Sequence, residues 1–225
     1  MRQNEIQVRT PAREQTGPVD VVIKTANGQA NRMGGFTYTS QRGNNLEVIG
    51  QLGGSVSAVA VYGHYAVIGE GPNLVVVDVT SPSSLQPSGR VLLDGLIYDI
   101  ALSTDNSYAY VSAGDAGIYI VQISDPLHPS VVGLYDTPKE AKWSDTLGGN
   151  LYLADSDDLM VFNMSNPAAP VILGTTTGVG EIYDLDVAVI NSSLLAFLAV
   201  DGDIQVFNVS DPAAPQRSPF ARCPA

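Results

Sequence analysis

One phrase occurs four times in this chain and constrains its fold more than any other feature. It is an apolar run that ends in a short polar residue and a proline: LVVVDVTSP (74–82), IYIVQISDP (118–126), LMVFNMSNP (159–167) and IQVFNVSDP (204–212). The closing prolines lie 44, 41 and 45 residues apart. An all-strand unit with a period of about 40 to 45 residues is typical of a β-propeller blade. Because repeat units bury a core between neighbours and leave their loops for recognition, the pattern favours a binding module over an enzyme.

Each repeat unit is predicted to contain four strands. The third strand is a continuous apolar run in every unit, which is typical of a strand buried on both faces. We expect these third strands to be central strands of four separate antiparallel sheets; they are residues 74–79, 118–123, 159–164 and 204–209. The predicted fold class is therefore an all-β propeller, with blades at about 54–93, 94–137, 138–178 and 179–210.

The sequence leaves two ways to complete the ring. The fourth unit is predicted to lack its fourth strand, because two prolines oppose a strand ladder in the irregular tail, 217–225. LEVIGQL (46–52) resembles a fourth strand but precedes the first unit. Through its residues 46–51 it is predicted to pair with 204–209 and to close a four-bladed ring. If more blades follow, the chain is instead an arc of a larger ring.

The repeated phrase also carries a family resemblance. A second proline follows the first in IVQISDPLHP, VFNMSNPAAP and VFNVSDPAAP. Together with LVVVDVTSP, these segments resemble LVIVD repeats over about residues 50–216. Such repeats are found mainly in large secreted or surface-anchored bacterial proteins. The resemblance implies propeller blades, a scaffold role and an extracellular location. It implies no reaction, because the family has no general catalytic motif.

Residues 1–40 do not fit the repeat. Asn27-Gly28 between the strand-like runs 19–25 and 34–39 is typical of a β-hairpin. The order V-x-T-P, G-x-V-D-V-V-I, N-G-Q and G-G-F-T-Y resembles the second half of an IPT/TIG domain, a small immunoglobulin-like sandwich often found in bacterial surface proteins. Half a sandwich cannot bury a proper core. We therefore expect the first methionine to lie inside a longer secreted protein; the alternative is an N-terminal extension that packs against the propeller.

The composition narrows the classes of partner. Of 225 residues, 11 are Lys or Arg and 23 are Asp or Glu, so the formal net charge is −12. This charge repels phosphate backbones and anionic lipids, so we expect neither nucleic acid nor membrane insertion. We expect a protein or carbohydrate ligand and a monomeric chain. Cys223 is the single cysteine and predicts no disulfide framework. The longest apolar run, 194–200, is too short for a membrane span, and the polar N-terminus does not resemble a signal peptide.

The search for catalytic motifs finds no nucleophile elbow, zinc-protease helix, phosphate-binding loop or dinucleotide fingerprint in the sequence. We therefore expect no cofactor, with calcium as the alternative. Ca²⁺ takes six to eight oxygen ligands in a flexible geometry, and acidic turns precede the third strands of the last two units. The weak calcium candidates are Asp155, Asp157, Asp158, Asp201 and Asp203. Because tight turns favour Asp in any case, turn chemistry is the simpler explanation.

A second candidate site comes from aligning the first strands. Ala58, Asp99, Lys142 and Asp184 are predicted to be equivalent and, since the first strand lines the channel of a propeller, to converge at one mouth. Two carboxylates facing a lysine can position a polar ligand. Neighbouring aromatic rings suit sugar recognition, although core packing also explains them. The candidate ligand-binding residues are Tyr98, Asp99, Lys142, Trp143, Tyr183 and Asp184.

These observations predict a non-enzymatic binding or scaffold segment of a secreted or cell-surface bacterial protein, with adhesion or the recognition of a protein or glycan as its task. The alternative is a calcium-dependent hydrolase or lyase whose site is the channel mouth, with Asp99 and Asp184 as metal ligands.

Overall fold

The computed structural model describes three stretches of the chain, residues 17–25, 28–38 and 56–218, and the side chains of the last stretch. By its internal contacts the chain divides into two compact units, residues 1–48 and 49–225. The described residues are strands, turns and bends, and among them there is no helix that could cross a membrane.

The described part of the first unit is an antiparallel hairpin. It consists of β1 (Gly17–Thr25) and β2 (Gly28–Tyr38), and Thr25 pairs with Gly28. Gly28 is therefore the first residue of a strand, and Asn27 of the predicted turn lies outside the described residues. A single hairpin is shared by many folds, so it does not identify an IPT/TIG domain.

The second unit contains four antiparallel sheets of four strands, one for each repeat. The first sheet consists of β3 (Val56–Tyr62), β4 (Tyr65–Glu70), β5 (Asn73–Asp78) and β6 (Gln86–Leu92). The second consists of β7 (Asp99–Leu102), β8 (Tyr108–Ser112), β9 (Ile118–Gln122) and β10 (Ser130–Tyr135). The third consists of β11 (Ala141–Leu147), β12 (Asn150–Asp155), β13 (Asp158–Asn163) and β14 (Val171–Thr176). The fourth consists of β15 (Ile182–Ile190), β16 (Ser193–Val200), β17 (Asp203–Asn208) and β18 (Gln216–Arg217).

The apolar third strands confirm the prediction made for them. β5, β9, β13 and β17 lie in four separate sheets, and each is hydrogen-bonded to a strand on both sides. At least four successive residues of β5, β9 and β13 are buried. An internal strand covered on both faces needs apolar side chains at every position, which is why its sequence is continuous rather than alternating.

The fourth sheet has a fourth strand, and the prediction that this strand is missing is wrong. The two residues of β18 pair with Phe207 and Asn208 of β17. The N–H group of Ser218 donates a further hydrogen bond to the carbonyl oxygen of Val206, 2.7 Å away. All three residues precede the first proline of the tail, so each retains an N–H group for the ladder. The predicted pairing of residues 46–51 with this sheet lies outside the described residues.

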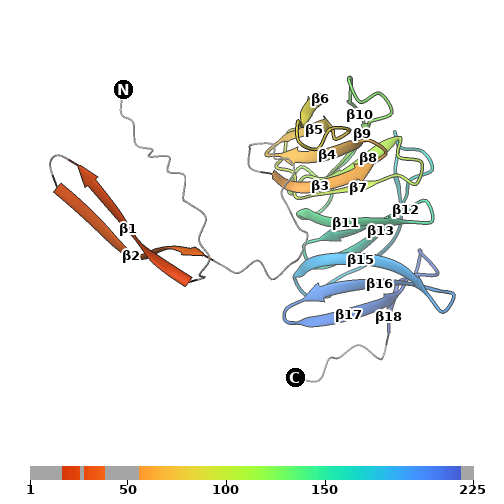
Figure 1. The fold of residues 1–225 in the computed structure, drawn as a ribbon. Helices are drawn as coiled ribbons and strands as arrows, with labels where there is room; N and C mark the ends of the chain where they lie inside the picture. The colour runs from red at the N-terminus through yellow and green to blue at the C-terminus, as the bar shows by residue number, and fades with distance from the viewer. Residues whose placement is uncertain (1–16, 26–27, 39–55, 219–225) are drawn as a thin grey trace. The chain divides into compact units, whose positions relative to one another are not determined.

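Consecutive sheets pack through their first strands, and Figure 1 shows the sheets following one another in chain order. β3 contacts β7, β7 contacts β11, and β11 contacts β15. An apolar cluster fills each of these interfaces, for example Leu74 and Val76 of the first sheet against Val111 and Tyr119 of the second. Within the described residues, each sheet packs extensively only on the sheet before it or after it, and the first and fourth sheets share no extensive contact. The described sheets therefore form an arc of a propeller.

The repeated proline turn packs against the preceding sheet. A Cβ atom on Gly89, in the outer strand β6, would lie 2.5 Å from the carbonyl oxygen of Pro126 in the turn of the second sheet. Only glycine allows so close an approach without displacing the turn. The same distance of 2.5 Å recurs at the next two interfaces, between Gly133 and Pro167 and between Gly174 and Pro212.

Candidate functional site

The first strands hold the predicted channel residues in register, with one exception. The pairing with the second strands aligns Ala58, Asp99, Trp143 and Asp184. The predicted equivalence of Lys142 is wrong by one residue, because the pairing of β11 shifts between Ala141 and Trp143. The same shift occurs in β3, between Val56 and Ala58, and in β15, between Ile182 and Asp184, so Lys142 is equivalent to Ser57 and Tyr183.

Asp99 joins the second sheet to the third. Its Oδ2 atom accepts hydrogen bonds from the N–H group of Ser144 at 2.8 Å and from the hydroxyl group of Ser144 at 3.2 Å. Asp145 does the same at the next interface, where its Oδ2 atom accepts from the N–H group of Val187 at 2.9 Å. We call Asp99 and Asp145 the clamp aspartates. Each satisfies a backbone donor on the first strand of the following sheet, which is a structural role.

Burial makes the ionised form of both clamp aspartates less favourable. It raises the pKa of Asp99 above the ordinary value of 3.8, and the nearby charge of Asp184 acts in the same direction. Burial also raises the pKa of Asp145, and Asp186 adds to this effect. Hydrogen bonds from backbone N–H groups oppose burial in both cases, because they stabilise the carboxylate.

Asp99→Asn is expected to flatten the dependence of stability on pH. A carboxyl group with a raised pKa in the folded chain stabilises the fold when protonated, so stability falls as the pH rises from the ordinary 3.8 through the raised value. Asparagine keeps an oxygen for Ser144 and does not ionise. Asp99→Ala leaves the N–H group of Ser144 without its acceptor, so it should lower the free energy of unfolding by about 1 to 3 kcal/mol. Urea denaturation at several pH values measures both effects. Identical pH profiles for Asp99→Asn and the parent would contradict this account.

Lys142 and Tyr183 have other polar partners than the channel carboxylates Asp99 and Asp184. Lys142 Nζ pairs with Glu140 Oε2 at 2.8 Å and with Glu181 Oε1 at 3.2 Å. The hydroxyl group of Tyr183 donates to Asp201 Oδ1 at 3.3 Å. The nearby charge of Asp201 raises the pKa of Tyr183, with a smaller opposing effect from Lys142. The lysine is thus held between two glutamates.

The remaining aromatic candidates have different surroundings. Trp143 packs against the apolar cluster between the third and fourth sheets. Tyr98 lies over Gly114, where a Cβ atom would sit 2.8 Å from the tyrosine ring. Tyr98 also lines a cavity of about 360 Å³ together with Asp115 and Glu140.

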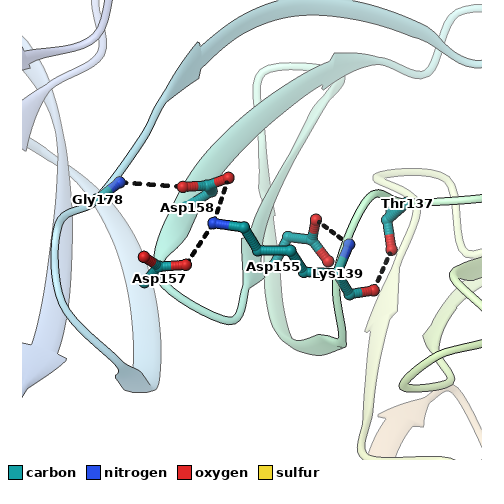
Figure 2. A network of polar contacts seen from close by, with 6 residues as sticks. All are labelled: Thr137, Lys139, Asp155, Asp157, Asp158 and Gly178. Atoms are coloured by element: carbon teal, nitrogen blue, oxygen red, sulfur yellow. Dashed lines mark hydrogen bonds and ion pairs between the residues drawn. The ribbon is translucent and has the colours of Figure 1, made fainter.

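Three of the calcium candidates lie in one network that already contains a cation, Lys139 (Figure 2). Lys139 Nζ pairs with Asp158 Oδ2 at 2.9 Å and also with Asp157 Oδ1. Hydrogen bonding within these pairs lowers the pKa of Asp157 and raises that of Lys139. Asp155 is fully buried, and burial raises its pKa. Its Oδ2 atom accepts from the N–H group of Lys139 at 3.0 Å, whereas its Oδ1 atom has no partner among the described residues.

The same network ties three connections together. Asp155, Asp157 and Asp158 belong to the hairpin between β12 and β13, and Lys139 comes from the segment before β11. The N–H group of Gly178, which precedes β15, donates to Asp158 Oδ1 at 3.0 Å. Figure 2 shows the lysine side chain reaching across to both turn carboxylates. The network therefore links the third sheet to the segments that enter and leave it.

The other calcium candidates, Asp201 and Asp203, flank the turn between β16 and β17. Asp203 Oδ1 accepts a hydrogen bond from the N–H group of Ile204 at 2.8 Å, and Asp201 accepts from Tyr183. Within the described residues, no group of three or more His, Cys, Asp or Glu side chains has a geometry that could hold a metal ion.

A cavity of about 500 Å³ lies at the end of the sheets that is opposite to these acidic turns. It is lined by the connections between the first and second strands of the second and third sheets. We call it the junction cavity. Its polar and aromatic lining residues are Ser103, Thr104, Asp105, Tyr108, Tyr110, Asn150, Asn163 and Ser165. None of the candidate residues predicted from the sequence lies in this cavity. Its signals were the Tyr-Ala-Tyr run at 108–110 and the Asn residues that begin and end the paired strands β12 and β13.

Three groups with complementary chemistry meet in the junction cavity. Asp105 Oδ1 accepts hydrogen bonds from the hydroxyl group of Ser103 at 2.7 Å and from the N–H group of Ser107 at 3.1 Å. These hydrogen bonds lower the pKa of Asp105, so the carboxylate is charged at neutral pH. Burial, together with the nearby Asp105 and Tyr108, raises the pKa of Tyr110 to about 12. The cavity thus offers a fixed acceptor beside the ring of Tyr108.

Comparison with known proteins identifies the repeats. The family model described as "LVIVD repeat" matches residues 53–92, 95–137 and 146–177, which together make up more than half of the chain. The chain belongs to the LVIVD repeat family. The matched LVIVD segments coincide with the first three sheets, and the fourth sheet, which has the same strand order, lies outside the match. No curated protein sequence matches the chain.

The fold of these LVIVD repeats is that of a propeller. The crystal structure of Sqt1 from Saccharomyces cerevisiae superposes with a TM-score of 0.60 at 10% sequence identity. The match covers 73% of this chain and 46% of the Sqt1 chain, so the LVIVD sheets span less than half of that protein. At this identity the likeness establishes the fold alone.

Proposed function

We propose that this chain is a non-enzymatic recognition module and that the junction cavity binds a carbohydrate. The observation that carries the proposal is the convergence of the half-buried Tyr108 with the charged Asp105 and with two asparagines, Asn150 and Asn163. Tyr110 lines the same cavity but is only 4% exposed. Tyrosine rings provide an apolar surface for the C–H face of a sugar ring, and carboxylate and amide groups hydrogen-bond its hydroxyl groups.

The charge of the cavity narrows the class of sugar. Asp105 Oδ2 has no hydrogen-bond partner among the described residues, whereas Oδ1 is held by Ser103 and Ser107. A carboxylate oriented in this way accepts hydrogen bonds from hydroxyl or ammonium groups and repels anions. The net charge of −12 acts in the same direction. Neutral sugars and amino sugars therefore fit better than uronic acids or sialic acids.

The proposal includes a location. We infer that the module is part of a secreted or surface-anchored bacterial protein, in which the segment 1–40 belongs to an IPT/TIG-like domain and the repeats contribute to adhesion. Membership of the LVIVD repeat family supports this location, as does the order of turn and strand motifs in the N-terminal segment. The predicted pair of channel carboxylates, Asp99 and Asp184, lends no comparable support to a reaction, since Asp99 is engaged in joining the second sheet to the third.

A glycan panel followed by calorimetry with the best ligand tests the proposal. Tyr108→Ala is expected to weaken binding at least about tenfold, because the ring supplies much of the buried contact area. Tyr65→Ala is the matched control: Tyr65 stands at the equivalent position of the first sheet and does not line the cavity. Binding to no member of the panel, or equal loss in both variants, would contradict the proposal. Capture of a protein at the cavity would show that its ligand is not a carbohydrate.

A further inference from the structure

The outer face of the fourth sheet is built like the face that each earlier sheet presents to its successor. Ile204, near the start of β17, is 51% exposed. The residues at its position in the earlier sheets are at most 2% exposed, because the next sheet covers them; they are Leu74, Ile118 and Leu159. Phe197 of β16 likewise stands where Tyr110 and Tyr152 are buried. An apolar face of this kind marks a site of association.

The fourth sheet also carries carboxylates at both clamp positions. Asp184 is equivalent to Asp99, and Asp186 is equivalent to Asp145. Both aspartates lie in β15, and both are exposed. Among the described residues, neither accepts a hydrogen bond from the backbone of another sheet, which is what the clamp aspartates do at the inner interfaces. β15 is therefore equipped to receive two backbone N–H groups from a further first strand.

The first sheet presents the complementary surface. Val59 of β3 is 63% exposed, whereas the residues at its position in the other sheets are 6% to 8% exposed: Ile100, Ser144 and Leu185. In the third sheet, the N–H group at this position is the one that Asp99 binds. Val61, at 65% exposure, stands at the position of Val187, whose N–H group Asp145 binds.

We propose that the first sheet of a second copy of this chain packs on the outer face of the fourth sheet. β3 of one copy then lies beside β15 of the other, as β11 lies beside β15 within the chain. The N–H groups of Val59 and Val61 meet Asp184 and Asp186, and Ile204 becomes covered. The contact repeats an interface that the chain already forms three times, so it needs no new geometry.

The repeated contact is head-to-tail, and such contacts either close into a ring or grow into a fibre. The four sheets match 46% of the Sqt1 chain, so two arcs together contain about as many sheets as one propeller of that size. Two copies give a ring of eight blades, which is within the usual range of about four to eight. We therefore expect a closed dimer with twice the mass of 23.7 kDa. A dimer departs from the monomeric chain expected from the sequence.

Sedimentation equilibrium of the full chain across micromolar concentrations tests the proposal. The parent is expected to show a monomer–dimer equilibrium without larger species. Ile204→Asp and Val59→Asp should each raise the dissociation constant at least about tenfold, because each places a charge in an apolar interface. Val171→Asp is the matched control, since Val171 is a strand valine with 59% exposure on the outer strand of the third sheet. It should leave the constant unchanged.

The Val59 variant separates the proposal from other modes of association. A symmetric dimer formed by two fourth sheets would be broken by Ile204→Asp but not by Val59→Asp. Mixing the two variants should restore dimers. The Ile204→Asp variant keeps an intact first-sheet face, the Val59→Asp variant keeps an intact fourth-sheet face, and these two faces can pair. A parent chain that is monomeric at every concentration, or a dimer insensitive to Val59→Asp, would overturn the proposal. A monomer that instead binds an added, separate LVIVD repeat would show that the face accepts a further blade and not a second copy. Circular dichroism of each variant verifies that it is folded.

Discussion

Gly133→Val is expected to lower the free energy of unfolding by about 3 kcal/mol, because the new side chain overpacks the interface between the second and third sheets. Its Cβ atom alone would lie 2.5 Å from the carbonyl oxygen of Pro167 and 3.3 Å from Ile120 Cδ1. The first of these neighbours is backbone in a proline turn, which cannot move aside as a flexible side chain does. Urea denaturation of the purified variant measures the loss.

Gly63→Ala is the control for the general cost of replacing a glycine. Gly63 has a φ of +51°, but a Cβ atom there would meet nothing within 4 Å. Its replacement should cost only the backbone strain, about 1 kcal/mol. If Gly133→Val were no more destabilising than Gly63→Ala, the close packing of the proline turn on the preceding sheet would not contribute to stability.

Lys139→Met is expected to produce the second large effect, a fall of several degrees in the melting temperature. The substitution leaves the buried Asp155 and Asp158 without the cation that faces them. The lysine side chain is 37% exposed but that of Asp158 only 8%, so removing the lysine leaves a carboxylate charge in a poorly solvated place. The loss should be greatest at neutral pH and smaller in mild acid, where the raised pKa of Asp155 lets this carboxyl become neutral.

Two variants show whether the loss arises from the uncompensated carboxylates. Adding Asp158→Asn to Lys139→Met should recover part of the stability, because asparagine removes the charge and still accepts from the N–H group of Gly178. Lys142→Met is the matched control, since its partners Glu140 and Glu181 are exposed and such pairs contribute little. A double variant that melts no higher than Lys139→Met, or a Lys142→Met variant that melts as low, would refute the explanation.

The repeat architecture could be predicted because its signals are local. β5, β9, β13 and β17 are continuous apolar runs, and that pattern depends only on neighbouring residues along the chain. The closing prolines set the period, so four separate sheets followed from the spacing. The LVIVD resemblance rested on the same residues, and the family model matches three of the four units.

The errors in the prediction lie where structure depends on pairing between strands. Lys142 was aligned with Asp99 and Asp184, but the pairing between first and second strands places Trp143 there, since Trp143 pairs with Ala154 as Asp184 pairs with Ala199. β18 was missed because two residues carry no period of their own and form a strand only when β17 offers its edge. Of the predicted channel group, Asp99 lies near Asp184, whereas Lys142 is held by glutamates.

By itself the sequence determined the fold class, the number of sheets, the buried third strands and the family, because periodicity and apolar runs report how each segment is covered. Only the tertiary structure decided which polar residues meet. Asp105 and Asn163 reach one cavity across two sheets, and Asp99 binds Ser144 across an interface. The two exposed end faces, marked by Val59 and Ile204, also became visible only in three dimensions. A residue pattern states that a side chain must be covered, and the packing of sheets decides what covers it.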